Sequence, residues 1–163
     1  MSPEERKRRV RQHIDLSWSK GRLALAEQLQ SRYFTYKSSF IAQPVNSAGF
    51  GLIVREIRQA IPDLEAVVDE CLSEGNRVVT SSTLFGTLEK TVFGLAPSNK
   101  ILTIAAMSIW TLNPAGDIEE INTLFDLESA RKQLGSVAAS CAAAPEPVFA
   151  RGKARGETFG RSK

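Results

Sequence analysis

Hydrophobic positions change their spacing once along this chain. Up to about residue 61 they recur every three or four positions, as in amphipathic helices, and after Pro62 they alternate with polar positions, as in strands. The first helix is expected to begin at Ser2-Pro3, because serine is a good N-cap and proline suits the first turn, and to end at Gly21. One face of this helix carries Val10, His13, Ile14, Ser17 and Trp18.

Two further helices and one short strand are expected before Pro62. An alanine- and leucine-rich segment predicts a helix over Leu23–Gln30, and Tyr33–Ile41 predicts a strand. The third helix is expected over Phe50–Ile61, since Pro62 and Asp63 stop it. Its apolar stripe consists of Leu52, Ile53, Ile57, Ala60 and Ile61.

Four strands are expected after this helix, over residues 64–73, 77–86, 100–112 and 117–126. The segments around Gly75 and Gly116 are turns between antiparallel neighbours, and a longer loop joins the second and third of these strands. A short last helix is expected from Asp126 to Leu134, with Gly135 as its stop. This order predicts an α+β fold, in which a curved, mostly antiparallel sheet wraps around the N-terminal helices and leaves an open, concave mouth.

The chain divides into one expected domain over residues 1–135 and a tail over 136–163. The tail is rich in Ala, Gly and Arg with few large apolar residues, which predicts a mobile segment. Five of the 21 Lys and Arg residues but only two of the 18 Asp and Glu residues lie in it, so the formal net charge of +3 belongs to the tail. The neutral domain argues against a nucleic-acid groove.

Cysteine and histidine are too few for a metal site or a disulfide framework. Cys71 and Cys141 do not form a C-x-x-C pair, and His13 is the only histidine. No apolar run approaches the roughly 18 residues of a membrane span, and the N-terminus lacks the apolar segment of a signal peptide. The sequence therefore predicts a cytoplasmic protein without a metal and without membrane contact.

Seven short motifs occur in a fixed order. They are V-x-x-x-x-D-x-x-W-x-x-G at 10–21, G-F at 49–50, A-I-P-D-L at 60–64, E-G-N-R-V at 74–78, G-T at 86–87 with F-G-L at 93–95 and P-S-N-K at 97–100, G-D-I-E-E at 116–120, and F-D at 125–126. With these motifs the chain resembles the SnoaL-like polyketide cyclases, a branch of the nuclear transport factor 2-like superfamily, over about residues 10–135.

The resemblance implies a cone-shaped α+β fold, often dimeric or tetrameric through the outer sheet face, with no metal and no organic cofactor. Known cyclases of the family close a ring by intramolecular aldol condensation. The family's acid on the last strand falls at Thr123 in this chain. Other site positions of the family that differ here fall at Tyr36, Ser81, Ser82, Leu88 and Ser108.

Threonine cannot supply the acid–base step of such a cyclase. Forming an enolate needs a base with a pKa near the working pH, and a carboxylate in an apolar cavity meets this need because desolvation raises its pKa. The Thr123 hydroxyl only donates and accepts hydrogen bonds. Among nearby carboxylates, Asp126 fits an N-cap better than a catalyst, Glu119 shares the face of Thr123 near the turn, and Glu120 points to the other face.

Three side chains remain as catalytic candidates, namely Thr123, Tyr36 and His13. His13 is the default base because its unperturbed pKa lies near neutrality, and its alternative role is that of a core or surface imidazole. Tyr36 is either a hydrogen-bond donor to a substrate carbonyl or an ordinary strand aromatic. The substrate-binding candidates are Trp18, Ser82, Ser108, Trp110, Ile121 and Phe125, with core packing as the alternative for Trp110.

Two functions from different classes remain open on these residues. One is a cofactor-independent cyclase or isomerase that tailors a polyketide-type or other natural product, through confinement and hydrogen bonds, on a small hydrophobic substrate. The other is a non-catalytic binding or assembly module that retains the fold. A homodimer is expected through the outer sheet face, with Leu102, Ile104 and Leu124 as its apolar contacts.

Overall fold

Most helices lie in the first part of the chain and most strands in the second part of the computed structural model, which describes residues 1–138. The first part contains α1 (Pro3–Ile14), the π-helical turn η1 (Asp15–Ser19), α2 (Leu23–Glu27), β1 (Gln30–Ser38) and α3 (Ser47–Ala60). The second part contains β2 (Glu65–Glu74), β3 (Arg77–Thr87), β4 (Ile101–Leu112), β5 (Ile118–Phe125) and α4 (Leu127–Ala138). None of these helices is long and apolar enough to cross a bilayer.

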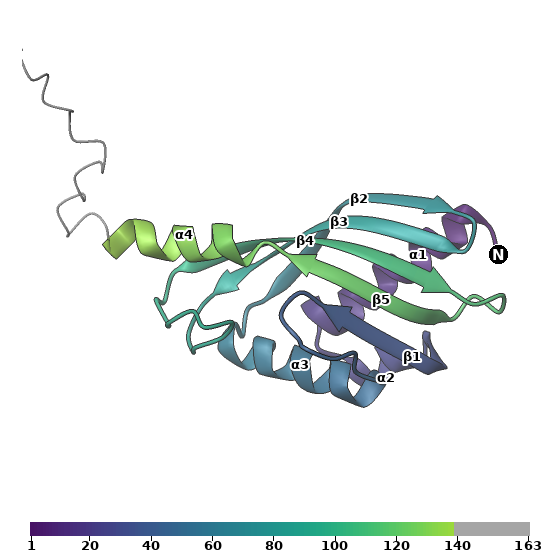
Figure 1. The fold of residues 1–163 in the computed structure, drawn as a ribbon, viewed down its shortest axis with the longest axis horizontal. Coiled ribbons are helices and arrows are strands. Elements are labelled where there is room, and N and C mark those ends of the chain that lie inside the picture. The colour runs from purple at the N-terminus through teal and green to yellow at the C-terminus, as the bar shows by residue number, and fades with distance from the viewer. Residues whose placement is uncertain (139–163) are drawn as a thin grey trace, which may run out of the picture.

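The five strands form one open, mixed sheet in the order β1-β5-β4-β3-β2. β1 runs parallel to β5, and every other neighbouring pair is antiparallel. In Figure 1, α1 lies behind the strands and α3 runs beside β1, so these N-terminal helices lie on one side of the sheet and its outer face points toward the viewer. α4 extends away from one end of the sheet. The predicted α+β fold with a curved, mostly antiparallel sheet is confirmed.

Local signals in the sequence fix the starts of α1, α3 and α4. Ser2 and Glu5 form a reciprocal capping box, in which the Glu5 amide donates to Ser2 Oγ at 3.1 Å and the Ser2 amide donates to Glu5 Oε2 at 2.6 Å. Asn46 caps α3 by accepting a hydrogen bond from the Gly49 amide at 3.0 Å. Asp126 accepts from the Ser129 amide at 3.0 Å before α4, so the cap interpretation of Asp126 is confirmed.

Several predicted boundaries were wrong by a few residues. α2 ends at Glu27 rather than Gln30, and β1 covers Gln30–Ser38 rather than 33–41, because Gln30 already pairs with Ile118 of β5. α3 starts at Ser47 because Asn46 supplies its cap. α4 passes through Gly135 and runs to Ala138, so Gly135 is not its stop. The predicted tail beyond residue 138 lies outside the described residues.

Two predicted faces were also wrong. Leu52 was expected in the core stripe of α3 but is 63% exposed, while Phe50, Val54 and Ile57 of that helix are buried. On β4, Leu102 and Ile104 were expected on the outer face but are buried, because even-numbered positions of this strand point toward the helices. Leu124 does lie on the outer face, as expected.

Candidate functional site

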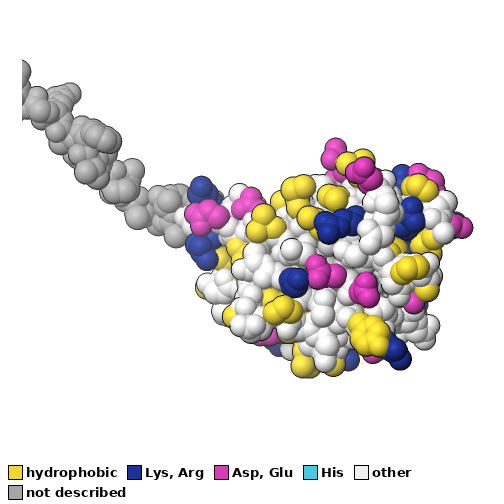
Figure 2. Space-filling model, turned by 45° about the vertical axis from the view of Figure 1, so that its right-hand side comes forward, with side chains coloured by type: hydrophobic (Ala, Val, Ile, Leu, Met, Phe, Trp, Pro, Cys, Tyr) yellow, Lys and Arg dark blue, Asp and Glu magenta, His cyan; other side chains and the backbone are white. Residues whose placement is uncertain are grey.

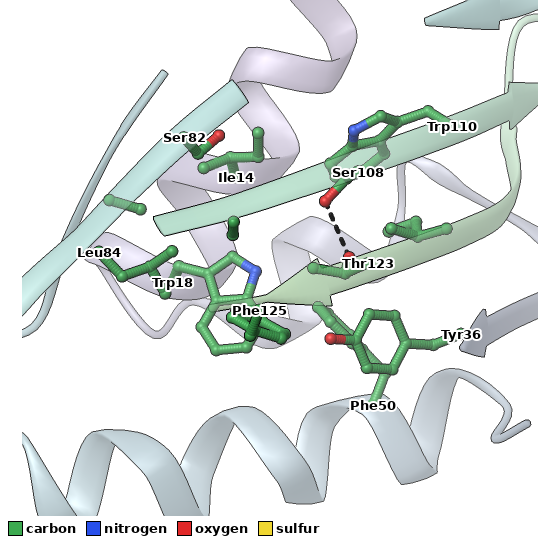
Figure 3. Close-up of a pocket in the computed structure, with 13 residues that line it drawn as sticks. Ile14, Trp18, Tyr36, Phe50, Ser82, Leu84, Ser108, Trp110, Thr123 and Phe125 are labelled. Carbon is green, nitrogen blue, oxygen red and sulfur yellow. Dashed lines mark hydrogen bonds between the residues drawn. The ribbon is translucent and has the colours of Figure 1, made fainter. Parts of the chain in front are cut away.

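A small chamber lies between the inner face of the sheet, η1 and α3. It leaves about 20 Å³ for the centre of a water molecule, which is room for about one water. Its walls come from every strand and from the first and third helices (Figure 3). The lining residues are Ile14, Trp18, Tyr36, Phe50, Ala66, Ser82, Leu84, Ala106, Ser108, Trp110, Ile121, Thr123 and Phe125. None of these described side chains carries a charge.

A row of hydroxyl side chains crosses the inner face of the sheet. The strand register places Thr80 opposite Ser108, and Ser108 opposite Thr123. All three are buried, and the Ser108 and Thr123 hydroxyls bond to each other at 2.8 Å. The Trp110 indole N–H donates to Thr80 Oγ1 at 3.0 Å. Thr80 was missed by the sequence analysis, although the alternation of β3 places it on the same face as Ser82.

Among the described lining residues, Tyr36 supplies the one fully buried hydroxyl that has no hydrogen-bond partner. Its side chain is 1% exposed and packs edge-on against Phe50, with ring centroids 4.9 Å apart. Burial raises the pKa of Tyr36 to about 12, while the nearby hydroxyls of Ser38 and Thr123 act in the opposite direction. Neither makes a well-formed hydrogen bond to it. In Figure 3 the Tyr36 hydroxyl points away from β1 toward the middle of the lining residues.

The π-helical turn positions Trp18. Its backbone is widened by one residue, as the bond from the Lys20 amide to the Asp15 carbonyl at 2.9 Å shows. The Arg58 guanidinium from α3 donates to the carbonyls of Trp18 and Ser19 and so fixes the end of the turn. The indole then packs edge-on against Phe50 and Phe125, each at 6.0 Å between ring centroids. No residue type marks a π-helix, so the sequence predicted only a continuous helix here.

His13 lies outside the chamber lining and deep in the core. It has no exposed surface and contacts the rings of Phe34, Phe50 and Trp110. Its Nε2 pairs with the Gln30 amide nitrogen at 2.8 Å, and its Nδ1 has no partner. Burial lowers the pKa of His13 from 6.5 to about 3, so the ring is neutral near pH 7.

The carboxylates near Thr123 stay at the surface. Asp126 is exposed, and its hydrogen bonds to Ser129 hold its pKa below the usual value. Glu120 forms an ion pair with Lys37 at 2.9 Å. Glu119 is half-buried, but it does not line the chamber. Within the described residues, no three His, Cys, Asp or Glu side chains come together as a metal-binding group.

The structure therefore brings together eight of the nine predicted site residues. Thr123, Tyr36, Trp18, Ser82, Ser108, Trp110, Ile121 and Phe125 all line the chamber, and His13 does not. Ile14, Phe50, Ala66, Leu84 and Ala106 complete the lining and were missed. Phe50 was recognisable as the first large apolar residue of α3, but the sequence did not show which side of that helix meets the sheet.

Comparison with known proteins assigns the family. The family model described as "SnoaL-like polyketide cyclase" matches residues 8–134, which is most of the chain. The chain belongs to this family. No curated protein matches this chain.

Solved structures share the fold at low sequence identity. TsrD from Streptomyces laurentii is 16% identical, with a TM-score of 0.72 over 83% of this chain and 99% of that one. AclR from Streptomyces galilaeus is 20% identical, with a TM-score of 0.71 over 83% and 98%. An LEH-like epoxide hydrolase from M. tuberculosis is 13% identical, with a TM-score of 0.63 over 85% and 97%. At these identities the similarity establishes only the fold. The printed descriptions of the neighbours name different activities, such as a hydroxylase for AclR and an epoxide hydrolase for the M. tuberculosis protein.

Proposed function

We propose that this SnoaL-like protein is a cofactor-independent cyclase or isomerase that acts on a polyketide-type or similar natural-product intermediate. The observation that supports it is a chamber whose described lining carries no charge but holds the hydroxyls of Tyr36, Ser82, Ser108 and Thr123. Such a lining suits a mostly apolar substrate with one or two oxygen atoms.

The reaction class follows from the lack, among these lining residues, of a group that titrates near neutral pH. Proton abstraction from an unactivated carbon needs a base, which Thr123 is not. Ring closure of an intermediate that already carries its enol does not need one. The enol carbon bonds to the carbonyl carbon, the carbonyl oxygen takes up the negative charge, and the proton of the enol hydroxyl ends on that oxygen.

Three features of the chamber serve this step. Once rearrangement has widened the chamber for the substrate, its aromatic walls hold the two reacting carbons near each other, in a folded conformation that is rarely populated in water. The unpartnered Tyr36 hydroxyl donates a hydrogen bond to the carbonyl oxygen as charge develops. The Ser108–Thr123 hydroxyl pair both accepts and donates, so it carries the proton across.

Replacing Tyr36 with Phe is expected to lower kcat about 100-fold, the value of one oxyanion-type donor. The same change is expected to leave the free energy of unfolding within about 1 kcal/mol of the wild type, because the lost hydroxyl has no partner. Turnover is measured on the intermediate made by the enzymes encoded beside the gene, by chromatography and mass spectrometry. Because an intramolecular aldol addition leaves the mass of the substrate unchanged, the product is recognised by a new retention time at the same mass.

Tyr33→Phe is the matched control, because it makes the same chemical change on β1 at a side chain that is 65% exposed. It is expected to retain full turnover. Equal turnover by Tyr36→Phe and Tyr33→Phe would contradict the role proposed for Tyr36.

A second candidate function is a non-catalytic binding or assembly module. The small volume of the chamber favours it, since about 20 Å³ admits one water and no natural product without rearrangement. Turnover of the intermediate made by enzymes encoded beside the gene would identify an enzyme. Stoichiometric binding of that intermediate without turnover would identify such a module.

We also propose that the protein forms a homodimer through the outer sheet face. The apolar side chains on this face differ from the predicted set and include Leu72, Val79, Met107, Ile109 and Leu124. The strand register joins them, since Met107 pairs with Leu124, and Ile109 with Val79, which in turn pairs with Leu72. Figure 2 shows hydrophobic side chains among polar ones on the surface of the molecule. A second copy would remove this apolar area from water.

The double variant Met107→Lys/Leu124→Lys is expected to be a monomer, because two adjacent cations repel their counterparts across a two-fold interface. Light scattering after size exclusion at micromolar concentration measures the mass. Leu52→Lys is the control, since Leu52 is as exposed as Leu124 but lies on α3. A monomeric wild type would contradict the homodimer.

A further inference from the structure

A large apolar groove lies just outside the chamber. The volume that the centres of water molecules can occupy in it is about 390 Å³, against about 20 Å³ in the chamber. Its walls come from α3, the segment after β1, the loop between β3 and β4 and the start of α4, which meet at one end of the molecule (Figure 1). The lining residues are Phe40, Ile41, Ile53, Glu56, Ile57, Val92, Phe93 and Leu127, of which only Glu56 is charged.

Three phenylalanines stand between the groove and the chamber. Phe125 lines the chamber, while Phe40 and Phe93 line the groove. Phe40 contacts Phe93 at 4.8 Å and Phe125 at 5.3 Å between ring centroids, and Phe93 lies 6.2 Å from Phe125. The two spaces are therefore neighbours, and aromatic side chains lie between them.

The backbone at Phe93 is strained. Its φ of 54° lies in the left-handed region, which is unfavourable for a bulky residue, and Gly94 follows with a φ of 70°. The turn is held on both sides, because Val92 and Leu95 are buried and exchange two backbone hydrogen bonds at 3.2 and 2.8 Å. Phe93 itself is half-buried at the tip of this turn. Phe125 lies in β5, while Phe40 and Phe93 both lie outside the strands. Of these three residues, only Phe93 has a left-handed backbone.

We propose that the groove is the outer half of the ligand site and that the Phe93 ring is a gate between groove and chamber. This inference rests on the proposed function, because it assumes that the chamber receives part of a ligand. With the gate open, the two spaces form one cleft long enough for a flat molecule. The small chamber then holds only the oxygen-bearing end, and the groove holds the apolar body.

The charges fix the class of ligand. The described chamber lining offers no cation, and Glu56 is the one charged side chain of the groove. An anion would lose its hydration without gaining a partner. Glu56 is exposed to solvent, so it would give a cation only a weak, screened partner. The cleft therefore takes an uncharged, flat, apolar molecule with a hydroxyl or carbonyl group at one end.

The probe is 2-naphthol, a neutral bicyclic molecule with one hydroxyl, and 2-naphthoate is its anionic counterpart. Stopped-flow tryptophan fluorescence follows binding to the wild type, Phe93→Ala and Phe93→Leu. The control is Phe85→Ala, because Phe85 is a half-buried phenylalanine on β3 that alternates with the inward-facing Leu84.

We expect Phe93→Ala to accelerate both association and dissociation of 2-naphthol at least 10-fold with less than a threefold change in Kd. Phe93→Leu should lie between it and the wild type, and Phe85→Ala should match the wild type. Acrylamide should quench tryptophan emission more efficiently in Phe93→Ala than in Phe85→Ala. This quenching measurement needs no ligand. The wild type should bind 2-naphthoate at least 10-fold more weakly than 2-naphthol.

Rate constants and quenching for Phe93→Ala within twofold of those for Phe85→Ala would overturn the gate. Tighter binding of 2-naphthoate than of 2-naphthol would overturn the ligand class, and no binding of either would overturn the outer site. Turnover lost in Tyr36→Phe with unchanged Phe93→Ala kinetics would leave the proposed function standing and remove only the gate.

Discussion

Lowering the pH from 7.5 to 4.5 is expected to cost this protein about 2–3 kcal/mol more stability than it costs a His13→Leu variant. The reason is that His13 is fully buried among three aromatic rings, and burial lowers its pKa from 6.5 to about 3. Between these two pKa values, His13 is protonated in the unfolded chain but stays neutral in the folded chain. The contribution of His13 is therefore fully present above pH 6.5 and is lost as the pH falls toward 3.

Urea unfolding at pH 7.5, 6.0 and 4.5 measures this difference. The window stays above pH 4.5 because Glu5, Asp63 and Asp126 have lowered pKa values and add their own loss at more acidic pH. His13→Gln is a second variant that does not titrate and still offers Gln30 a polar partner. Parallel stability curves for the wild type and both variants would show that water or a conformational change solvates His13 in the folded protein.

Thr123→Asp is expected to be about 4 kcal/mol less stable than Thr123→Asn at pH 7.5. Position 123 is 6% exposed in a chamber whose described lining has no cation, so burial should raise the pKa of the new carboxyl by about three units. A folded-state pKa raised in this way disfavours the folded state as the pH rises. The difference should therefore shrink to about 1 kcal/mol at pH 4.5.

Asparagine is the matched control because it has nearly the same shape as aspartate and no charge. Chemical denaturation of the two variants at pH 7.5 and 4.5 isolates the cost of the charge. Equal stability at pH 7.5 would mean that the chamber solvates or pairs a carboxylate, contrary to the burial of position 123 and the uncharged lining.

The strands were predictable because alternation and turn residues agree. Gly75 and Gly116 adopt φ values of +56° and +90° at the two turns that the sequence marks, and β2 to β5 lie within one residue of their predicted bounds. The inner and outer faces of β4 were harder to assign. Ile101, Met107 and Ile109 on one face are as apolar as Leu102 and Ile104 on the other, so polarity gave no sign of which face is covered.

The chamber residues were predictable as a set but not in their environment. The family resemblance and strand parity placed Tyr36, Ser82, Ser108 and Thr123 together. The burial of His13 was not visible, because its place in the helix fits a core edge as well as a solvent-facing site. The π-helical turn under Trp18 and the left-handed backbone at Phe93 depend on long-range contacts, which local spacing does not encode.

The central claim is that the chamber acts through uncharged hydrogen-bonding groups, and the pH dependence of turnover tests it most directly. The measurement is kcat/KM of the wild type from pH 5.5 to 8.5 on the intermediate of the neighbouring pathway, with circular dichroism to correct for the folded fraction. Because the described lining offers only the hydroxyls of Tyr36, Ser82, Ser108 and Thr123, and the Tyr36 pKa is about 12, the profile should be flat. A bell-shaped profile that disappears on replacing Glu119, Asp126 or His13 would contradict the claim and identify the true acid or base.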